Sequence, residues 1–275
     1  MPLPISRSAL QSLGRRLAKS TATEADWEKL YEVLEHYRLA SVEAQELLRQ
    51  VGFELTARVK SRDTLIDKIR TGSSLASIQD VAGIRLDPCA DLDEQDDIVL
   101  QVGRLFEEGS VVKDRRPEPN HGYRAVHVVV TCQALPVEIQ VRTILQNGWA
   151  QIIERMGDRW GRGLRYGQVD TTLDHELRPG LTRRDLYQLA MRAGEHIAEV
   201  EVRRQVLRRM RRALDDLDRV MLSNTDTRED RYGQPIPGSS PAWNSISRRG
   251  SGGASWQCRS KWRGTSWTPC ARCLL

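Results

Sequence analysis

The chain has 275 residues, of which 29% are charged and 39% hydrophobic, and it carries a formal net charge of +5. This length suffices for one sizeable core with helical additions. Because no run of eighteen apolar residues occurs and the start lacks a signal-peptide core, we expect a cytoplasmic protein with no membrane partner. The five cysteines are an odd number, and three of them lie among the last eighteen residues, which argues against a disulfide framework.

The positive charge is unevenly distributed along the chain. Seven of the 42 basic residues and none of the 37 acidic residues follow Asp230, so residues 1–230 contain 35 basic residues against 37 acidic ones. The basic character therefore belongs to the tail, and the charge of the body does not by itself indicate a nucleic-acid partner.

The predicted elements begin with an amphipathic helix. Apolar residues recur at steps of three and four between Glu24 and Val51, and Thr23 is placed to cap this helix. A strand-rich centre follows, with candidate strands at 82–87, 110–114, 123–131 and 136–143. Helical stretches lie between and after these strands, at 62–70, 93–108 and 144–157. Residues 183–222 return to helical spacing, which predicts a long helix or helical hairpin that packs on the core or on another subunit.

The last two candidate strands predict one polar face. Side chains alternate between the two faces of a sheet, which separates apolar residues from a polar set made up of Glu138, Gln140 and Arg142. Only a short segment joins the two strands, so a hairpin would bring Tyr123 and His127 beside this polar set. An exposed sheet face is often polar only because it contacts solvent. An aromatic ring, an imidazole, a carboxylate and a guanidinium on one patch nevertheless suit a nucleotide site.

Five short motifs occur in order along the centre of the chain. They are R-V-K-x-x-x-T-x-x-x-K at 58–68, D-V-A-G-I-R at 80–85, G-Y-R-A-V-H at 122–127, V-E-I-Q-V-R-T at 137–143, and W-A with a following Glu at 149–154. In this order and spacing they resemble the synthetase domain of the RelA/SpoT alarmone family. The hydrolase domain of that family needs an adjacent His-Asp pair for its metal site, and no such dipeptide occurs in this sequence. The chain is therefore similar to the small, synthetase-only members.

The resemblance implies an α+β fold of the nucleotidyltransferase-like type, with a mixed β-sheet of about five strands flanked by helices and a C-terminal helical extension. Four segments follow from it, namely an N-terminal helical flank at 1–55, the synthetase core at 56–175, the helical extension at 176–225 and a tail at 226–275. Gly, Ser, Pro, Arg and Trp dominate the tail without periodicity, so we expect it to be disordered.

The resemblance assigns the donor side of a nucleotide site to five residues that would bind ATP. Arg58, Lys60 and Lys68 match the basic residues that hold the ATP phosphates. Thr64 stands where the family usually has Ser and keeps the hydroxyl, and Arg85 matches the arginine that stacks on adenine. A helix that begins near residue 62 would add its N-terminal amides to the same phosphates.

The catalytic set implied by the resemblance consists of Asp80, Glu138 and His127. Asp80 and Glu138 match the two carboxylates that bind Mg²⁺, and Glu138 also matches the group that helps to deprotonate the attacking 3′-hydroxyl. On the acceptor side, Tyr123 matches the aromatic residue that stacks on the acceptor base. His127, Gln140 and Arg142 match residues that line the acceptor and transfer region.

The acceptor loop departs from the family pattern. Family members that use GTP or GDP carry a lysine-bearing loop that grips the 5′ phosphates of the acceptor. Here the loop begins at Lys113, is one residue shorter and lacks the second lysine. Arg115 and Arg116 would supply the missing charge, although arginine is not a neutral replacement for lysine at a phosphate site.

The function implied is transfer of the β,γ-pyrophosphoryl group of ATP to the 3′-hydroxyl of GTP or GDP, as in guanosine tetraphosphate metabolism and the stringent response. Because the acceptor loop is altered, two alternatives stay open. The first is a toxic family member that modifies the 3′ end of tRNA or an adenine nucleotide and that is restrained by an antitoxin. The second is an inactive nucleotide-binding regulator. The resemblance also implies a homo-oligomer formed through the C-terminal helices.

Overall fold

The computed structural model describes residues 3, 5–106 and 109–226 of the chain. The chain separates into two compact units, residues 1–218 and 219–275, and the fold and the candidate site belong to the first. Apart from Asp226, the predicted tail lies outside the described residues, so its disorder stays a prediction. No helix in the described part of the chain combines the length and the apolar composition needed to cross a membrane.

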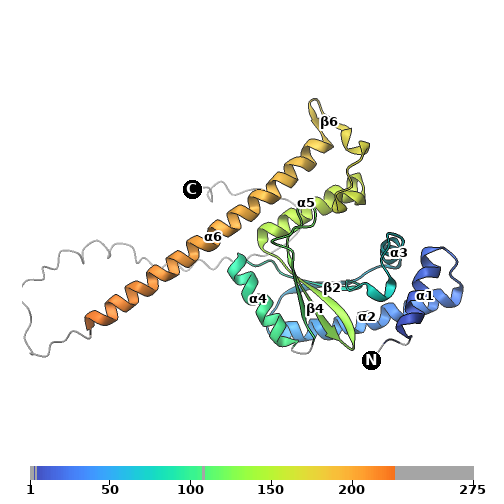
Figure 1. The fold of residues 1–275 in the computed structure, drawn as a ribbon, viewed down its shortest axis with the longest axis horizontal. Coiled ribbons are helices and arrows are strands. Elements are labelled where there is room, and N and C mark those ends of the chain that lie inside the picture. Colours follow the sequence, from blue (N-terminus) through green and yellow to red (C-terminus); the bar gives the residue numbers. More distant parts are fainter. Residues whose placement is uncertain (1–2, 4, 107–108, 227–275) are drawn as a thin grey trace, which may run out of the picture. The chain divides into compact units, whose positions relative to one another are not determined.

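A five-stranded mixed sheet forms the centre of the first unit (Figure 1). Its strands are β1 (Leu55–Val59), β2 (Ala82–Leu86), β3 (Val111–Asp114), β4 (Val126–Cys132) and β5 (Leu135–Val141). Their order across the sheet is β1-β2-β5-β4-β3, in which β2 and β5 are parallel and all other neighbours are antiparallel. The sequence prediction of an α+β fold with a mixed five-stranded sheet is therefore confirmed.

Helices flank the sheet and extend beyond it. They are α1 (Arg7–Ala18), α2 (Glu24–Gln50), α3 (Arg62–Arg70), α4 (Leu92–Leu105), α5 (Ile144–Trp160) and the long α6 (Arg183–Asp226). The described residues also form three short 3₁₀ helices and a second, two-stranded sheet; these elements are η1 (Leu75–Ser77), η2 (Arg162–Tyr166), η3 (Thr171–Asp174), β6 (Glu176–Arg178) and β7 (Leu181–Thr182). Helices α2 and α4 contact the sheet and each other, and in Figure 1 α5 lies on the opposite side of the sheet from α2. The predicted C-terminal helical extension is a single helix, α6, rather than a hairpin.

The hairpin predicted between the last two strands is present. Gln133 and Ala134 join β4 to β5 with φ values of 50° and 62°. A two-residue turn with positive φ at both positions has the twist that matches two antiparallel strands. The pairing of His127 with Gln140 places these two side chains on one face of the sheet, as the alternation predicts.

Two elements differ from the sequence prediction for local reasons. Strand β4 begins at Val126 rather than at residue 123, because His121 and Gly122 adopt φ values of 50° and 81° and turn the chain just before the strand. Strand β1 has no predicted counterpart. It lies at the edge of the sheet and exposes three consecutive residues, so it lacks the alternation that identifies a half-buried strand.

The main core lies between the apolar face of the sheet and α2 and α4. Ile84, Ile139 and Val128 are register neighbours on β2, β5 and β4, and all three are buried. Helix α2 begins with a capping box in which the side chains of Thr23 and Asp26 accept each other's backbone N–H, so the predicted cap is confirmed. The apolar face of the sheet is thus covered, and the opposite, polar face is left for chemistry.

We expect Ile139→Ala to lower the free energy of unfolding by about 3–4 kcal/mol, because it opens a cavity in the centre of the sheet where Ile139 is 0% exposed. Urea denaturation followed by circular dichroism measures this change. Val112→Ala provides the control, since Val112 pairs with Val128 in the same register row but is 51% exposed. Equal losses in the two variants would contradict this assignment of the core.

Candidate active site

The strand register gathers the predicted site residues on the polar face of the sheet. One row across the sheet contains Arg85 on β2, Gln140 on β5, His127 on β4 and Lys113 on β3. The next row contains Arg58 on β1, Gly83 on β2 and Glu138 on β5. Because Gly83 has no side chain, none stands between Arg58 and Glu138 in that row. The order of the strands therefore joins donor-side and acceptor-side residues on one surface.

Five polar side chains on this face form a closed ring of four hydrogen bonds and one ion-pair contact, called the five-residue ring below; its members are Tyr123, His127, Glu138, Gln140 and Arg142. Arg142 Nη2 donates to the Tyr123 hydroxyl at 2.8 Å and to Gln140 Oε1 at 3.0 Å. Gln140 Nε2 donates to Glu138 Oε1 at 2.9 Å. The ring closes through His127, whose Nε2 lies 2.8 Å from the Tyr123 hydroxyl and whose Nδ1 lies 3.5 Å from Glu138 Oε2.

The donors in the ring determine the direction of each bond around His127. The Tyr123 oxygen accepts from Arg142, so its own proton is directed at His127 Nε2. Burial raises the pKa of the Tyr123 phenol above its usual value, although Arg142 partly offsets this effect, so the phenol keeps its proton at neutral pH. In neutral His127, Nε2 then accepts and Nδ1–H points toward Glu138. The ring thus presents Glu138 with a donor on each carboxylate oxygen.

Glu138 is ionised although it is buried. Burial works to raise its pKa, but the bonds with His127 and Gln140 outweigh this effect and hold the pKa below the usual value for a glutamate. The charge of Asp80 acts on Glu138 in the opposite direction, so the two carboxylates interact with each other. A buried, charged carboxylate and a second carboxylate nearby together provide the oxygen ligands that a hard divalent cation prefers.

Asp80 lies between two lysines at the start of β2. Lys68 Nζ on α3 is 2.6 Å from Asp80 Oδ1, and Lys60 Nζ at the end of β1 is 3.1 Å from Oδ2. Burial works to raise the pKa of Asp80, but the two ammonium groups outweigh it and lower the pKa. Thr64 lies at the first turn of α3, where its hydroxyl oxygen is 2.9 Å from that of the N-cap Ser61.

A cluster of arginines completes the polar face. Arg85 Nη2 bonds to Glu154 Oε1 on α5 at 3.2 Å. Burial lowers the pKa of Arg85, and the positive charges of Arg142 and Arg58 lower it further, so these guanidinium groups repel one another. Arg142 is only 3% exposed, and its Nε and Nη1 have no hydrogen-bond partner. A buried cation with unpaired donors beside other cations is a strong site for an anion such as a phosphate.

The predicted acceptor loop is only partly joined to this face. Lys113 Nζ donates to Gln79 Oε1, beside Asp80, and Arg115 is exposed. Arg116 instead binds two carboxylates, those of Asp96 and Asp114, each at 2.7 Å. The charge of Arg116 is therefore neutralised within the fold. Of the three cations predicted to bind the acceptor, Arg116 is thus paired with protein carboxylates instead.

Three of the partners of site residues that are absent from the sequence prediction of the site bind its cations. They are Glu154, Gln79 and Asp96, which bind Arg85, Lys113 and Arg116. Glu154 ends the last of the five motifs, and that position was the only signal in the sequence. Gln79 and Asp96 lie in segments without a motif, so only packing identifies them.

The residues on the polar face fit a magnesium ion that is shared with a substrate. No group of three metal-ligating side chains occurs among the described residues. Mg²⁺ commonly takes one or two protein carboxylates and completes its coordination with substrate phosphates and water, so the pair Asp80 and Glu138 meets that requirement. The chemistry of the donor set, two ionised carboxylates beside phosphate-binding cations, carries this assignment.

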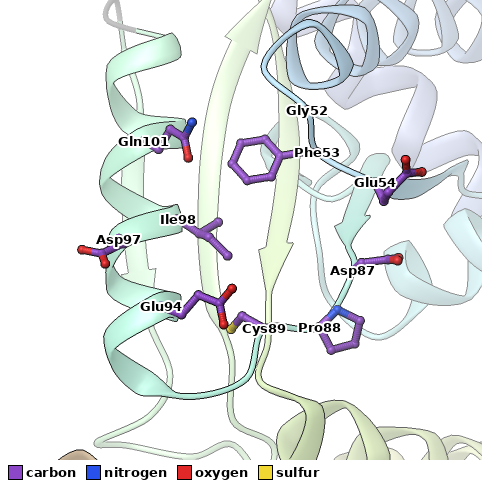
Figure 2. A pocket seen from close by; sticks show the side chains of 10 residues that line it. All are labelled: Gly52, Phe53, Glu54, Asp87, Pro88, Cys89, Glu94, Asp97, Ile98 and Gln101. Carbon is purple, nitrogen blue, oxygen red and sulfur yellow. The ribbon is translucent and has the colours of Figure 1, made fainter. Parts of the chain in front are cut away.

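A cavity of about 450 Å³ lies next to α4 (Figure 2). Phe53 and Ile98 point toward each other inside it, and four carboxylates line it, those of Glu54, Asp87, Glu94 and Asp97. None of the predicted site residues lines this cavity. Its negative charge would repel nucleotide phosphates, so the active-site assignment stays with the polar face of the sheet.

We expect Tyr123→Phe to lower kcat by about 10-fold and to change the KM for the acceptor by less than about twofold, because the variant keeps the aromatic ring but breaks the bonds that hold His127 toward Glu138. Steady-state kinetics with the accepted nucleotide measures both values. Tyr123→Leu, which also removes the ring, should in addition raise the KM. A Phe variant with wild-type kcat would show that the five-residue ring does not support the reaction.

Comparisons with known proteins show which family the chain resembles. The model of the region found in RelA / SpoT proteins matches residues 57–156, which include every predicted site residue. Uncharacterized protein Rv1366 of Mycobacterium tuberculosis and uncharacterized protein Mb1401 of Mycobacterium bovis are each 34% identical over 215 residues, covering 72% of this chain and 79% of theirs.

Solved structures show the same fold. Small alarmone synthetase 1 from Bacillus subtilis aligns with a TM-score of 0.51 at 21% identity and covers 68% of this chain and 99% of its own. Small alarmone synthetase 2 from the same organism aligns with a TM-score of 0.52 at 19% identity and covers 67% and 99%. The chain therefore belongs to the RelA/SpoT family, and its described core has the fold of the small alarmone synthetases.

Proposed function

We propose that this protein is a cytoplasmic ATP-dependent pyrophosphokinase that transfers the β,γ-pyrophosphoryl group of ATP to the 3′-hydroxyl of GTP or GDP. The observation that carries the proposal is the pair of interacting carboxylates, Asp80 and Glu138, on a sheet face lined by cations. Phosphoryl-type transfer depends mainly on charge neutralisation and alignment, and this face offers groups for both.

Each group on the face has a task in this reaction. Arg58, Lys60 and Lys68 bind the ATP phosphates, and Asp80 and Glu138 would hold a Mg²⁺ ion. The bound Mg²⁺ supplies charge neutralisation for the phosphates. Thr64 adds its hydroxyl at the α3 N-terminus, and Arg85 stacks on adenine.

The acceptor side aligns the attacking hydroxyl. Tyr123 stacks on the acceptor base, and Arg142 with its unpaired donors binds an acceptor phosphate. The 3′ oxygen forms a bond to the β phosphorus of ATP, the bond from that phosphorus to the α–β bridging oxygen breaks, and AMP leaves. Glu138 accepts the hydroxyl proton, and His127 with Gln140 keeps this carboxylate oriented.

A specific observation supports a second candidate acceptor. Arg116 is bound to two carboxylates, so the acceptor loop offers fewer cations for a 5′ di- or triphosphate than the sequence indicates. An acceptor without these phosphates, such as the 3′-terminal adenosine of tRNA, needs fewer of them. In that case the protein is a translation-blocking toxin for which an antitoxin is expected.

The experiment that tests the proposal is incubation of the purified chain with γ-labelled ATP and Mg²⁺ against GTP, GDP, AMP and deacylated tRNA, with separation of the labelled products. Label on GTP or GDP is the expected result. Label on AMP or tRNA would replace the acceptor but keep the reaction. ATP binding without transfer to any acceptor would overturn the proposal in favour of a nucleotide-binding regulator.

We also propose that the protein forms a homo-oligomer through α6. Four apolar residues at helical spacing, Leu207, Met210, Leu214 and Leu217, are exposed on this helix, and such a stripe is typical of a face that packs on another helix. We expect the double variant Leu207→Glu with Leu214→Glu to be a monomer in light scattering and the wild type to be an oligomer. A monomeric wild type at micromolar concentration would exclude this interface.

A further inference from the structure

Helix α6 is bonded to the acceptor side of the candidate site at three places. Trp149 Nε1 on α5 donates to the carbonyl oxygen of Ala190 at 2.7 Å. Arg124, which follows Tyr123, donates to the carbonyl oxygen of Gly194 at 3.0 Å. Further along α6, the carboxylate of Glu201 accepts from residues of the first turn of α5. These bonds hold the segment that carries the Tyr123 ring and the segment that carries the Arg142 guanidinium.

The side chain of Glu201 is buried although it carries a carboxylate. It is 4% exposed, and its carboxylate accepts from the hydroxyl of Thr143 and from Gln146 Nε2, the latter at 3.1 Å. Thr143 is the N-cap of α5, and Gln146 is its partner in the capping box. A carboxylate at a helix N-terminus is favoured by the helix dipole, so Glu201 stabilises this turn both by hydrogen bonds and by charge.

The turn held by Glu201 is directly connected to Arg142. Thr143 follows Arg142 in the chain, and the carbonyl oxygen of Arg142 accepts from Cys89 N at 3.0 Å. On the other side, Gln95 Nε2 donates to the carbonyl oxygen of Val141 at 2.8 Å and to Gln146 Oε1 at 2.9 Å. The backbone on each side of Arg142 is therefore fixed by a network that ends on the carboxylate of Glu201.

A displacement of this backbone would reach the five-residue ring through Arg142. The Arg142 side chain makes two of the bonds of the ring, to Tyr123 and Gln140. The residues that would bind the ATP phosphates have no such connection, because within residues 5–106 and 109–218 no hydrogen bond or ion pair joins α6 to β1 or α3. Through these bonds α6 therefore supports the acceptor side of the site.

We propose that Glu201 is a positioning residue for the acceptor, which acts through Thr143 and Arg142 and leaves the binding of ATP unchanged. This inference rests on the proposed function, since it assigns Tyr123 and Arg142 to the acceptor. It makes α6 a part of the active-site scaffold as well as a surface for assembly. The side chain of Glu201 touches no substrate.

The test compares Glu201→Ala and Glu201→Gln with Glu199→Gln in the full chain. Glu199 lies on the same helix with its side chain 59% exposed, so its variant controls for a change of charge on α6. We expect Glu201→Ala to raise the KM for the acceptor by about 10-fold or more and to change the KM for ATP by less than about twofold. Glu201→Gln keeps one acceptor and the side-chain volume, so it should fold like the wild type and raise the acceptor KM by a smaller factor.

A second readout separates this inference from the proposed function. Amide hydrogen exchange, which needs no turnover, should be faster at residues 143–147 in Glu201→Ala and unchanged at residues 62–70 of α3. Equal increases of both KM values, or unchanged exchange at residues 143–147, would overturn the role of Glu201. Absence of transfer by the wild type with every acceptor would instead overturn the proposed function, and the exchange pattern would still decide whether Glu201 holds this turn.

Discussion

Asp80→Asn and Glu138→Gln are each expected to lower the rate of pyrophosphoryl transfer by at least about 10³-fold while the protein stays folded. Each variant removes one of the two negative charges that would hold Mg²⁺ and keeps the shape of the side chain. In Glu138→Gln the bond from Gln140 can still form, because the new amide also has an oxygen acceptor. The measurement is the transfer rate with labelled ATP, alongside urea denaturation of each variant.

A matched control shows that the effect belongs to the site. Asp67 is an exposed residue of α3, and its Oδ2 lies 3.6 Å from Nη1 of Arg162. Because it lies outside the candidate site, Asp67→Asn should keep the wild-type rate. Asp67→Asn should unfold at the wild-type midpoint. Asp80→Asn and Glu138→Gln should stay folded with a modestly lower midpoint, because the side chains of Asp80 and Glu138 are only 26% and 12% exposed and lose part of their pairing. A wild-type rate in either Asp80→Asn or Glu138→Gln would remove the proposed metal site.

Arg142→Met is expected to lower kcat/KM for the acceptor by at least about 100-fold without lowering the free energy of unfolding. Arg142 is buried with two unpaired nitrogen donors and, among the described residues, no carboxylate partner, and the charge of Arg85 lies close by. Burying such a cation costs free energy in the absence of an anion, and an apolar side chain of similar length avoids that cost. The variant therefore separates stability from function, which urea denaturation and steady-state kinetics measure.

Arg116→Met is the matched control and should behave in the opposite way. Arg116 is bonded to Asp96 and Asp114, so its removal leaves two carboxylates without their partner and should lower the free energy of unfolding by about 1–3 kcal/mol. We expect the KM for the acceptor to change little. If Arg116→Met lowered kcat/KM for the acceptor as much as Arg142→Met does, then Arg116 would bind the acceptor as the sequence motif predicts.

Local periodicity explains which parts of the fold could be predicted from the sequence. The helical spacing of α2 and the alternation along β5 are properties of neighbouring residues, so they appear in the sequence without any knowledge of packing. The turn at Gln133 and Ala134 is equally local. Strand β1 has no predicted counterpart because it is an exposed edge strand, and helix α1 is predicted only as part of the N-terminal helical flank, without bounds of its own.

The family, the type of most elements and the polar composition of one sheet face could be predicted from the amino-acid sequence, because motifs and side-chain alternation lie within short stretches of chain. Which charged side chains pair with each other depends on the tertiary structure. The parallel pairing of β2 with β5 brings Gly83 beside Glu138, although 54 positions separate them in the chain. Packing likewise pairs Arg116 with Asp96 and leaves donors of Arg142 unpaired. Glu201 reaches Thr143 from a helix that no motif covers. Such contacts depend on strand order and helix docking, which join distant segments and leave no periodic pattern in the sequence.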